Sequence, residues 1–434
     1  MGNFEKNISL EFDNFNKSNG DSWIKSHRAE TFEKFKSLGI PKLTDEDWRF
    51  TNLSDFSSKP YSLNAKTPNS FDQTLVPEIL KDIDGYFIIL VNGKLVEYSS
   101  DNFQVHDISD MLQEDECAFK DLIKGSFSDK NQDFSFFLNS SFLDRGCFIE
   151  INSSIKIQKP IVILNFFDNN AEMSLINHRN IISISSSSSV KIIEYSFAVD
   201  GIDYFSNKST FFYLDDNSNV EHLSIDDGSK NSHIFSNIKI NQGRDSNFTT
   251  DSILIGGKLF RNNVHPILNG EGSNSNVLGL YLSKDSQLMD NYMFVEHAKA
   301  HCDSRQLYKG LLNDNSKGVF HGRILVHNEA QKTDAKQTNR NLLLSNTAQV
   351  DTKPQLEIYA DDVKCTHGAT TGQIDKEALY YLRARGINED LARIMMIRSF
   401  TEEVLEFITD DVLLDLHKRV VERWFIESNL ISGD

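Results

Sequence analysis

The sequence predicts a mainly β protein in which a long array of short strands lies between helical segments at the two ends of the chain. Between about residues 134 and 372, apolar runs of strand length are separated by Asn, Asp, Gly and Ser, and no long helical pattern occurs. Both ends of the chain carry apolar residues at helical spacing instead. So many strands are typical of a sandwich, a barrel, a propeller or a solenoid. A stacked solenoid fits this length best, although no clean internal repeat is visible.

Residues 1–75 are expected to form an N-terminal helical segment followed by a linker. Apolar side chains from Trp23 to Leu38 recur near helical spacing, and Gly39 with the following Pro41 is typical of a helix end. Another short helix is expected to begin near Thr44. The stretch 52–76 is rich in Ser, Pro, Asn and Lys, which predicts a linker or irregular surface.

Residues 76–133 are expected to form a mixed α/β connecting segment that leads into the β core. Two apolar runs between Tyr86 and Tyr98 flank the dipeptide Asn92-Gly93. Because both residues of this dipeptide adopt positive φ readily, it favours a tight turn between antiparallel strands. We therefore predict a β-hairpin over Tyr86–Tyr98.

Residues 134–372 are expected to form the β core. Runs such as Cys147–Ile151, Ile161–Phe167 and Val190–Phe197 have the length and the composition of strands. Asn is frequent where the runs end, and this residue tolerates the left-handed backbone conformation of tight turns. We expect the breaks between runs to be such turns.

Residues 373–434 are expected to form a C-terminal helical domain. Asp375 and Asn388 are placed to cap two successive helices, and Gly386 is placed to end the first of them. A third amphipathic helix is expected over about Asp410–Phe425. Helices that follow a β array either cap it or present a docking surface.

The charge balance argues against several classes of partner. The 434 residues include 45 Lys and Arg against 63 Asp and Glu, which gives a net charge of −18. An acidic surface repels phosphate backbones and anionic membranes. No apolar run approaches the roughly 20 residues of a membrane helix, and the N-terminus has no secretory pattern. The four cysteines form no C-x-x-C pair, so we expect a reducing, cytoplasmic location.

Common catalytic and nucleotide motifs are missing from the sequence. It contains no G-x-x-x-x-G-K-[ST] loop, no G-x-G-x-x-G that opens a helix, no G-x-S-x-G and no H-E-x-x-H. We therefore expect this chain not to hydrolyse nucleotides itself.

The sharpest candidate site is the sequence Cys365-Thr366-His367-Gly368. In an extended strand, residues 365 and 367 lie on the same face. A thiolate beside an imidazole suits iron, zinc or an iron–sulfur cluster. Asp361 and Asp362 lie just upstream, where they could bind iron or orient His367. The alternative is an inert thiol beside an ordinary polar histidine.

A second candidate cluster is His297, His301 and Cys302. On a helix, residues 297 and 301 would face the same way, but their neighbours are typical of a strand and a turn. No third ligand is evident, so the sequence assigns these residues no role. The other histidines, such as His178 and His222, are expected to be ordinary core or surface residues.

Several stretches closely resemble the SufB/SufD family of iron–sulfur cluster assembly proteins. The densest is residues 341–386, which includes T-K-P-Q-L-E-I-Y-A-D-D-V-K-C-T-H-G-A-T. Other stretches that resemble family blocks are residues 304–310, 319–322, 330–335, 178–180, 38–41 and 46–51. The form of the main block and the absence of a cysteine-rich N-terminal motif favour the SufD-like branch. The resemblance implies a right-handed parallel β-helix flanked by N-terminal and C-terminal helical domains.

The resemblance also implies a role. Family members are non-ATPase scaffold components of the Suf machinery, which implies that this chain is not an enzyme and that a partner chain hydrolyses ATP. A SufD-like chain is expected to pair with a SufB-like paralogue through the β-helix, or with itself when isolated. Its C-terminal helical domain is expected to dock a SufC-like ABC ATPase. His367, and with weaker support Cys365, match residues at the interface with the paralogue, where iron or a nascent cluster is expected to sit transiently.

Two other interpretations of the sequence stay open. The chain could be a purely structural partner in the assembly complex, with no metal site of its own. It could also be a carbohydrate-active β-helix enzyme, which would need paired carboxylates in a groove. In the block that carries the resemblance, Asp361-Asp362 is the acidic pair to test for that activity.

Overall fold

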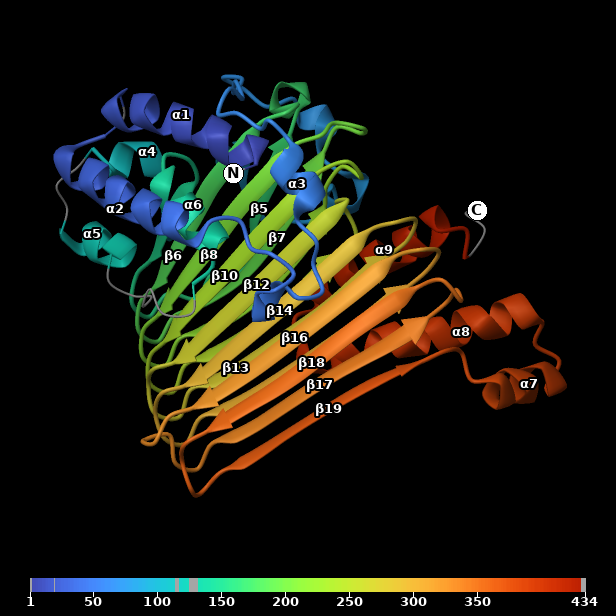
Figure 1. Ribbon diagram of the computed structural model, residues 1–434. Helices are drawn as coiled ribbons and strands as arrows, with labels where there is room; N and C mark the ends of the chain where they lie inside the picture. The colour runs from blue at the N-terminus through green and yellow to red at the C-terminus, as the bar shows by residue number, and fades with distance from the viewer. Residues whose placement is uncertain (1, 19, 114–116, 125–131, 431–434) are drawn as a thin grey trace.

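Two large β-sheets lie face to face in the computed structural model, which describes residues 2–18, 20–113, 117–124 and 132–430. Successive strands of the core alternate between the sheets, so each strand pairs in parallel with the strand two positions along the chain. Helices lie at both ends of this stack (Figure 1). The predicted β-solenoid with flanking helices is therefore confirmed.

The two sheets contain nine and ten strands. Within them, the hairpin β1–β2 and the pair β3–β4 are antiparallel. The nine-stranded sheet has the order β18 (Gln349–Ile358), β16 (Lys317–Val326), β14 (Leu288–His297), β12 (Leu259–Leu268), β10 (His233–Gln242), β8 (Phe205–Leu214), β6 (Leu175–Ile184), β4 (Cys147–Ile151), β3 (Gln104–Asp107). The ten-stranded sheet has the order β19 (Lys364–Gly372), β17 (Asp334–Leu343), β15 (Asp303–Leu312), β13 (Asn274–Ser283), β11 (Asn247–Leu254), β9 (Asn219–Asp227), β7 (Ser189–Ala198), β5 (Ile161–Phe167), β1 (Tyr86–Val91), β2 (Lys94–Tyr98).

Tight turns join the strands, and most place one residue at positive φ. Asn217 has a φ of 59° between β8 and β9, and Asp245 has a φ of 53° between β10 and β11. The left-handed turns expected from the frequent Asn are therefore present, although Asp and Ser also occupy this position. Since the turn recurs in successive coils, it keeps the strands in register.

The three largest hydrophobic cores of the described residues hold the layers together, and a smaller fourth cluster surrounds Phe167 and Tyr204. The first fills the space between the two sheets. The second lies between the outer face of the nine-stranded sheet and the N-terminal helices, where Phe12 stacks on Phe32 with ring centroids 3.8 Å apart. The third lies between the ten-stranded sheet and the C-terminal helices. Each face of both sheets is thus covered over part of its length, which is usual for parallel sheets.

The N-terminal region is more helical than the sequence predicted. The expected helix and hairpin are confirmed as α2 and β1–β2, with Asn92 and Gly93 at φ 49° and 79°. The helix expected near Thr44 is the single turn η1, and the expected linker contains α3, η2 and η3. Helix α1 was not predicted. The helices and single helical turns of this region are α1 (Asn3–Ser18), α2 (Ser22–Leu38), η1 (Glu46–Trp48), α3 (Ser54–Ser58), η2 (Gln73–Leu75), η3 (Glu78–Leu80), α4 (Ile108–Met111) and α5 (Cys117–Lys124).

Helix α6 (Phe134–Ser141) occupies the residues at which we expected the β core to begin. The Asp133 carboxylate accepts hydrogen bonds from the backbone N–H groups of Ser135 and Phe136, which starts the helix. Every residue of α6 is buried against the sheet or the N-terminal helices. The first strand after this helix is β4, so the expected core region begins with a short helix and not with a strand.

Three predicted C-terminal helices are present. They are α7 (Lys376–Ala384), α8 (Glu389–Glu402), and α9 (Asp411–Glu427), which follows the single turn η5 (Glu403–Phe407). Asp375, Asn388 and Asp410 cap them through side-chain hydrogen bonds, the first two as predicted. No helix in the described ranges of the chain is long and apolar enough to cross a membrane.

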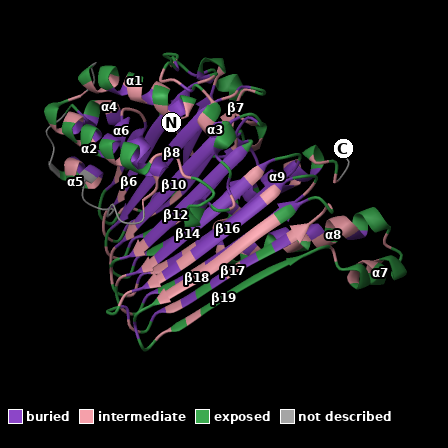
Figure 2. Ribbon diagram, viewed as in Figure 1, coloured by how far each residue is buried: buried purple, intermediate pink, exposed green. Residues whose placement is uncertain are grey.

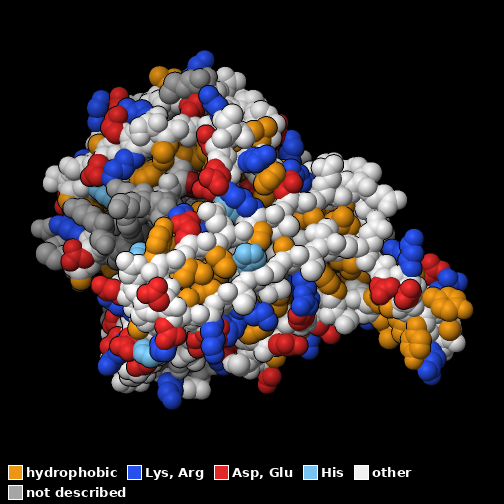
Figure 3. Space-filling view, turned by 60° about the horizontal axis from the view of Figure 1, so that its bottom comes forward, with side chains coloured by type: hydrophobic (Ala, Val, Ile, Leu, Met, Phe, Trp, Pro, Cys, Tyr) orange, Lys and Arg blue, Asp and Glu red, His pale blue; other side chains and the backbone are white. Residues whose placement is uncertain are grey.

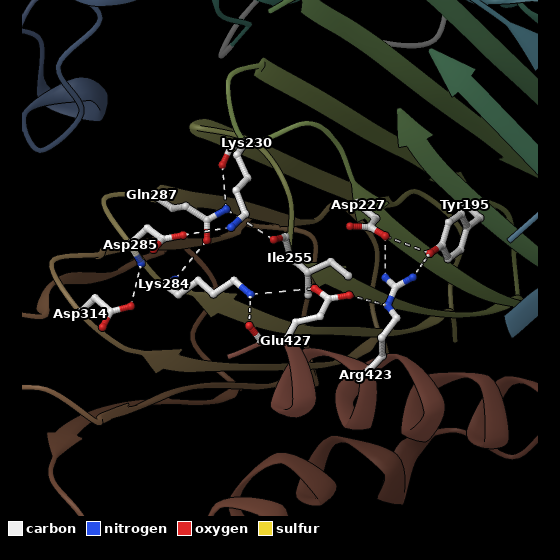
Figure 4. A network of polar contacts seen from close by, with 11 residues as sticks. Tyr195, Asp227, Lys230, Ile255, Lys284, Asp285, Gln287, Asp314, Arg423 and Glu427 are labelled. Carbon is white, nitrogen blue, oxygen red and sulfur yellow. Dashed lines mark hydrogen bonds and ion pairs between the residues drawn. The ribbon is translucent and has the colours of Figure 1, made fainter. Parts of the chain in front are cut away.

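Polar contacts fix α9 to the ten-stranded sheet (Figure 4). Arg423 donates to Asp227 at 2.5 Å and to the hydroxyl of Tyr195 at 3.0 Å. Deeper in the interface, Nδ1 of His417 lies 2.6 Å from the Asp251 carboxylate, and both side chains are buried. Because buried polar groups are specific in their geometry, these contacts fix the position of α9 on the sheet.

Buried histidines predict a pH-dependent stability. The histidines concerned are His178, His233, His265 and His297. Burial lowers their pKa values to about 3 or 4, below the usual value of about 6.5. Below pH 6.5 the unfolded chain binds protons that the folded chain does not. The free energy of unfolding should therefore fall as the pH falls from about 6.5 towards 4, by about 1.4 kcal/mol per pH unit for each histidine.

The variant His297→Gln isolates one of these contributions. Urea unfolding at pH 7, 6 and 5 should show a smaller pH slope in the variant, by about one proton. Gln keeps a polar group that can reach Ser304, whose hydroxyl lies 2.8 Å from the histidine Nε2. Equal slopes in variant and wild type would contradict this account.

Candidate functional site

The C-terminal end of the solenoid is open. Among the described residues, the last strands of the two sheets, β18 and β19, each have a neighbour on one side only. The central strands are buried, whereas β18 is mostly half-buried and β19 mostly exposed (Figure 2). Edge strands present unpaired backbone N–H and C=O groups and favour pairing with another chain. This end therefore exposes edge strands of the kind that can pair with another chain.

Cys365 and His367 both lie on β19. Each continues a column of aligned residues from successive strands, and the side chains of these columns face the interior. In the parallel register, Cys365 pairs with Ala335 of β17, and His367 pairs with Gln337. Ala335 and Gln337 are buried between the sheets. The same-face arrangement predicted from the spacing is therefore present. At the open end, the interior face of the last strand becomes a surface.

The environments of the two side chains differ. Cys365 is half-buried against the hydrophobic interior, and this burial raises the pKa of its thiol. His367 is exposed. A protonated thiol must lose its proton when it binds a metal. The pair therefore offers one protected soft ligand and one accessible imidazole.

The described residues do not complete a metal site around this pair. No group of three His, Cys, Asp or Glu side chains in ranges 2–18, 20–113, 117–124 and 132–430 could hold a metal ion. Asp362 forms an ion pair with Lys332, so its carboxylate is engaged in the turn that precedes β19.

His297, His301 and Cys302 are not brought together as ligands. His297 is buried between the sheets, with Nε2 beside the Ser304 hydroxyl. His301 has a φ of 59° and takes the left-handed position of a turn, and its side chain is exposed. Cys302 is buried directly before β15, where Ser218, Ser246 and Ser273 precede β9, β11 and β13. Its thiol is therefore a structural member of the recurring turn.

Other ionisable groups inside the solenoid pair with one another. Lys208 lies 2.5 Å from Asp226, and Glu194 lies 3.4 Å from His222. Thr210 also donates to Glu194. These side chains are buried, so they satisfy each other within the core and present no surface site. Of the two alternatives left for His178 and His222, core or surface, the structure shows the core, since both side chains are buried.

A second exposed surface lies on the C-terminal helices. No residue of α7 is buried, and its Tyr380 and Tyr381 are 72% and 58% exposed. On α8, Leu391 and Met395 are 46% and 43% exposed. In Figure 3 the projecting helical arm carries hydrophobic side chains. We call helices α7 and α8, which carry these four side chains, the apolar arm. An exposed apolar cluster of this kind is typical of a protein interaction surface.

Comparison with known protein families shows which family this chain belongs to. A family model described as "SUF system FeS cluster assembly, SufBD core domain" matches residues 166–400. A second, described as the SufBD protein N-terminal region, matches residues 11–163. The chain belongs to the SufBD family. It is therefore an iron–sulfur cluster assembly protein of that family, as the sequence resemblance implied.

Individual SufBD relatives are similar over most of their length. The iron–sulfur cluster assembly protein SufD of Escherichia coli K12 is 30% identical over 382 residues, which cover 86% of this chain and 87% of that protein. A SufBD family protein of Synechocystis is 28% identical over 402 residues, covering 89% and 88%. Protein ABCI7, chloroplastic, of Arabidopsis thaliana is 27% identical over 396 residues, covering 87% and 81%. The similarity to SufD supports the SufD-like branch.

Proposed function

We propose that this chain is a SufD-like, non-ATPase scaffold of a cytoplasmic Suf complex. In this proposal the open end of the solenoid pairs with a SufB-like paralogue, and the apolar arm docks a SufC-like ABC ATPase. His367 and Cys365 contribute ligands to iron or a nascent iron–sulfur cluster held between the two solenoids. The cluster is cargo that the complex builds and passes on.

The observation that carries the proposal is the position of Cys365 and His367 on an exposed edge strand. Iron–sulfur clusters are held by thiolates, and imidazoles replace some of them in certain sites. Two donors from this chain leave the remaining positions for a partner. A site shared between two chains also opens when they move apart, which suits transient binding. Ile358 of β18, exposed to 41%, adds apolar surface to the same end.

The apolar arm supports the second half of the proposal. A groove of about 530 Å³ runs between the arm and the end of β17, lined by residues that include Leu344, Leu379 and Arg393. The base of the arm is tied to the sheet, because the Lys309 ammonium and the Arg340 guanidinium both form ion pairs with Glu403 of η5. Movement of a docked ATPase would therefore be transmitted to β15 and β17.

The partner interface is tested by the variant Ile358→Asp. A carboxylate at the open end should weaken association with the SufB-like paralogue by about tenfold or more, because burying an unpaired charge costs more than the lost apolar contact. Tyr98→Asp, at the opposite edge of the ten-stranded sheet, is the matched control, since Tyr98 is exposed to 55%. Association is measured by light scattering or calorimetry. Equal effects of the two variants would place the interface elsewhere.

A further inference from the structure

A separate cavity of about 100 Å³ lies on the outer face of the nine-stranded sheet. Strands β10, β12 and β14 form its floor. Trp48 of η1 and the pair Gln132-Asp133 before α6 cover it. A water molecule occupies about 30 Å³ of liquid, so the cavity has room for a few waters or one small polyatomic ion. None of its lining residues belongs to the open end or to the apolar arm.

Lys239 is the main charged group in this cavity. Its side chain is buried, and its Nζ lies 2.6 Å from Oε1 of Gln132 and 3.5 Å from Nδ1 of His265. Both partners are neutral. Among the described residues, no carboxylate lies within ion-pair distance of this Nζ. A buried ammonium without a counter-ion is unfavourable, and a bound anion would remove that cost.

Burial keeps His265 neutral, and its hydrogen bonds fix which ring nitrogen carries the proton. The Glu296 carboxylate lies 3.3 Å from its Nε2 and 2.7 Å from Nε2 of His327. Burial lowers the pKa of His265 to about 4, so the ring is neutral at pH 7. With the proton on Nε2, Nδ1 is an acceptor for Lys239. Two of the three Lys239 donors are therefore used, and one remains.

Arg261 provides a second cation in the cavity wall. Its guanidinium lies between two aromatic rings, 4.3 Å from the centroid of Trp48 and 4.8 Å from that of Tyr292. It pairs with the buried Asp290 at 2.6 Å, and its Nε donates to Oδ1 of Asn263 at 2.8 Å. The group is thus held rigidly at the cavity, as a pre-organised recognition group is.

The two acidic residues of the lining form no ion pair with Lys239. Oδ1 of Asp133 caps α6, and its Oδ2 accepts from Asn263 at 3.0 Å. The Asp47 side chain is half-exposed at the rim, with its carboxylate 3.4 Å from His321. Burial lowers the pKa of Lys239 to about 8, and the nearby charge of Asp133 opposes this shift. Neither carboxylate forms an ion pair with Lys239, so one donor of its ammonium stays available to a bound anion.

We propose that this cavity binds a small oxyanion, a phosphate or a carboxylate, through Lys239 with Arg261 in the wall. Asn237 lines the same space, and its amide donates one N–H to the Ser135 hydroxyl at 3.2 Å, which leaves the other for an oxyanion. Both N–H groups of Asn263 donate within the wall, to Asp133 and to Asn237. A bound anion would connect the η1 segment, the start of α6 and strands β10 and β12. It would therefore stabilise the attachment of the N-terminal region to the solenoid.

Calorimetric titration of the full chain with inorganic phosphate, and separately with acetate, at constant ionic strength tests this. We expect saturable binding of at least one anion with a Kd of about 1 mM or tighter, weakened at least about tenfold in Lys239→Met. Methionine keeps the apolar stem and removes the charge, so the variant should fold. Lys230→Met is the matched control, because Lys230 is exposed and pairs with Asp285 at 3.2 Å.

A second measurement does not depend on any variant. Wild-type crystals grown without oxyanions and soaked in selenate should show an anomalous selenium peak beside Lys239. No saturable heat with either anion, equal affinity in wild type and Lys239→Met, or selenium found only outside the cavity would each overturn the proposal. The cavity would then contain water alone.

Discussion

Replacing both Cys365 and His367 with alanine is expected to reduce cluster formation at least about tenfold, the scale of losses at metal sites. Both side chains lie at the open end, where truncation removes few contacts, so fold and complex should be preserved. The measurement is anaerobic reconstitution of the complex with its paralogue and ATPase, followed by the visible absorption of the cluster and by transfer to an apo-protein.

The matched control is Thr366→Ala with Thr370→Ala. Both threonines are exposed on β19, and by strand alternation they lie on the face opposite to residues 365 and 367. We expect this control to assemble clusters at the wild-type rate. Unchanged assembly in the double variant of Cys365 and His367 would instead support the purely structural role that the sequence left open.

The double variant Leu391→Asp with Met395→Asp is expected to weaken ATPase binding by about 100-fold. Burying each of these side chains in an interface is worth about 1.5–3 kcal/mol, and a buried carboxylate adds a desolvation cost. Both side chains are exposed in the isolated chain, so the variant should keep its stability. Calorimetric titration with the ATPase measures the affinity, and thermal unfolding checks the fold.

Val412→Asp provides the control for the apolar arm. Val412 is exposed to 37%, but it lies on α9, which packs on the ten-stranded sheet. We expect wild-type affinity for the ATPase in this variant. Loss of binding in the control, or retention in the double variant, would show that the ATPase docks on another surface.

Local patterns in the sequence predicted elements whose signals are contained in a few residues. Asn92-Gly93 defined the hairpin, and Asp375 and Asn388 marked two helix starts, because turns and caps depend on single side chains. The spacing of Phe4, Ile8 and Phe12 would have predicted α1, since all three side chains are buried.

Other features depend on contacts between distant residues. The apolar run of α6 suits a strand as well as a helix, and the Asp133 cap decides between them. Strands pair with partners about 30 residues away, as Leu259 pairs with Leu288, while the residues in a column change from coil to coil. The strand positions therefore repeat from coil to coil while the residue types do not, so the sequence shows no visible periodicity.

The candidate site was predictable in part. The spacing of Cys365 and His367 predicted a shared face, and the register with β17 confirms it. The sequence did not predict that this face lies at the open end, because exposure depends on where the stack stops. It also gave no sign of the cavity around Lys239, whose lining comes from five separate segments of the chain.

The central claim is that His367 binds the nascent cluster in the assembled complex. Pulsed electron paramagnetic resonance of the reduced, cluster-loaded complex tests this directly when only this chain carries ¹⁵N-labelled histidine. We predict a ¹⁵N hyperfine coupling typical of a ligated imidazole, which disappears in His367→Ala. A cluster-loaded wild-type complex without such a coupling would contradict the account.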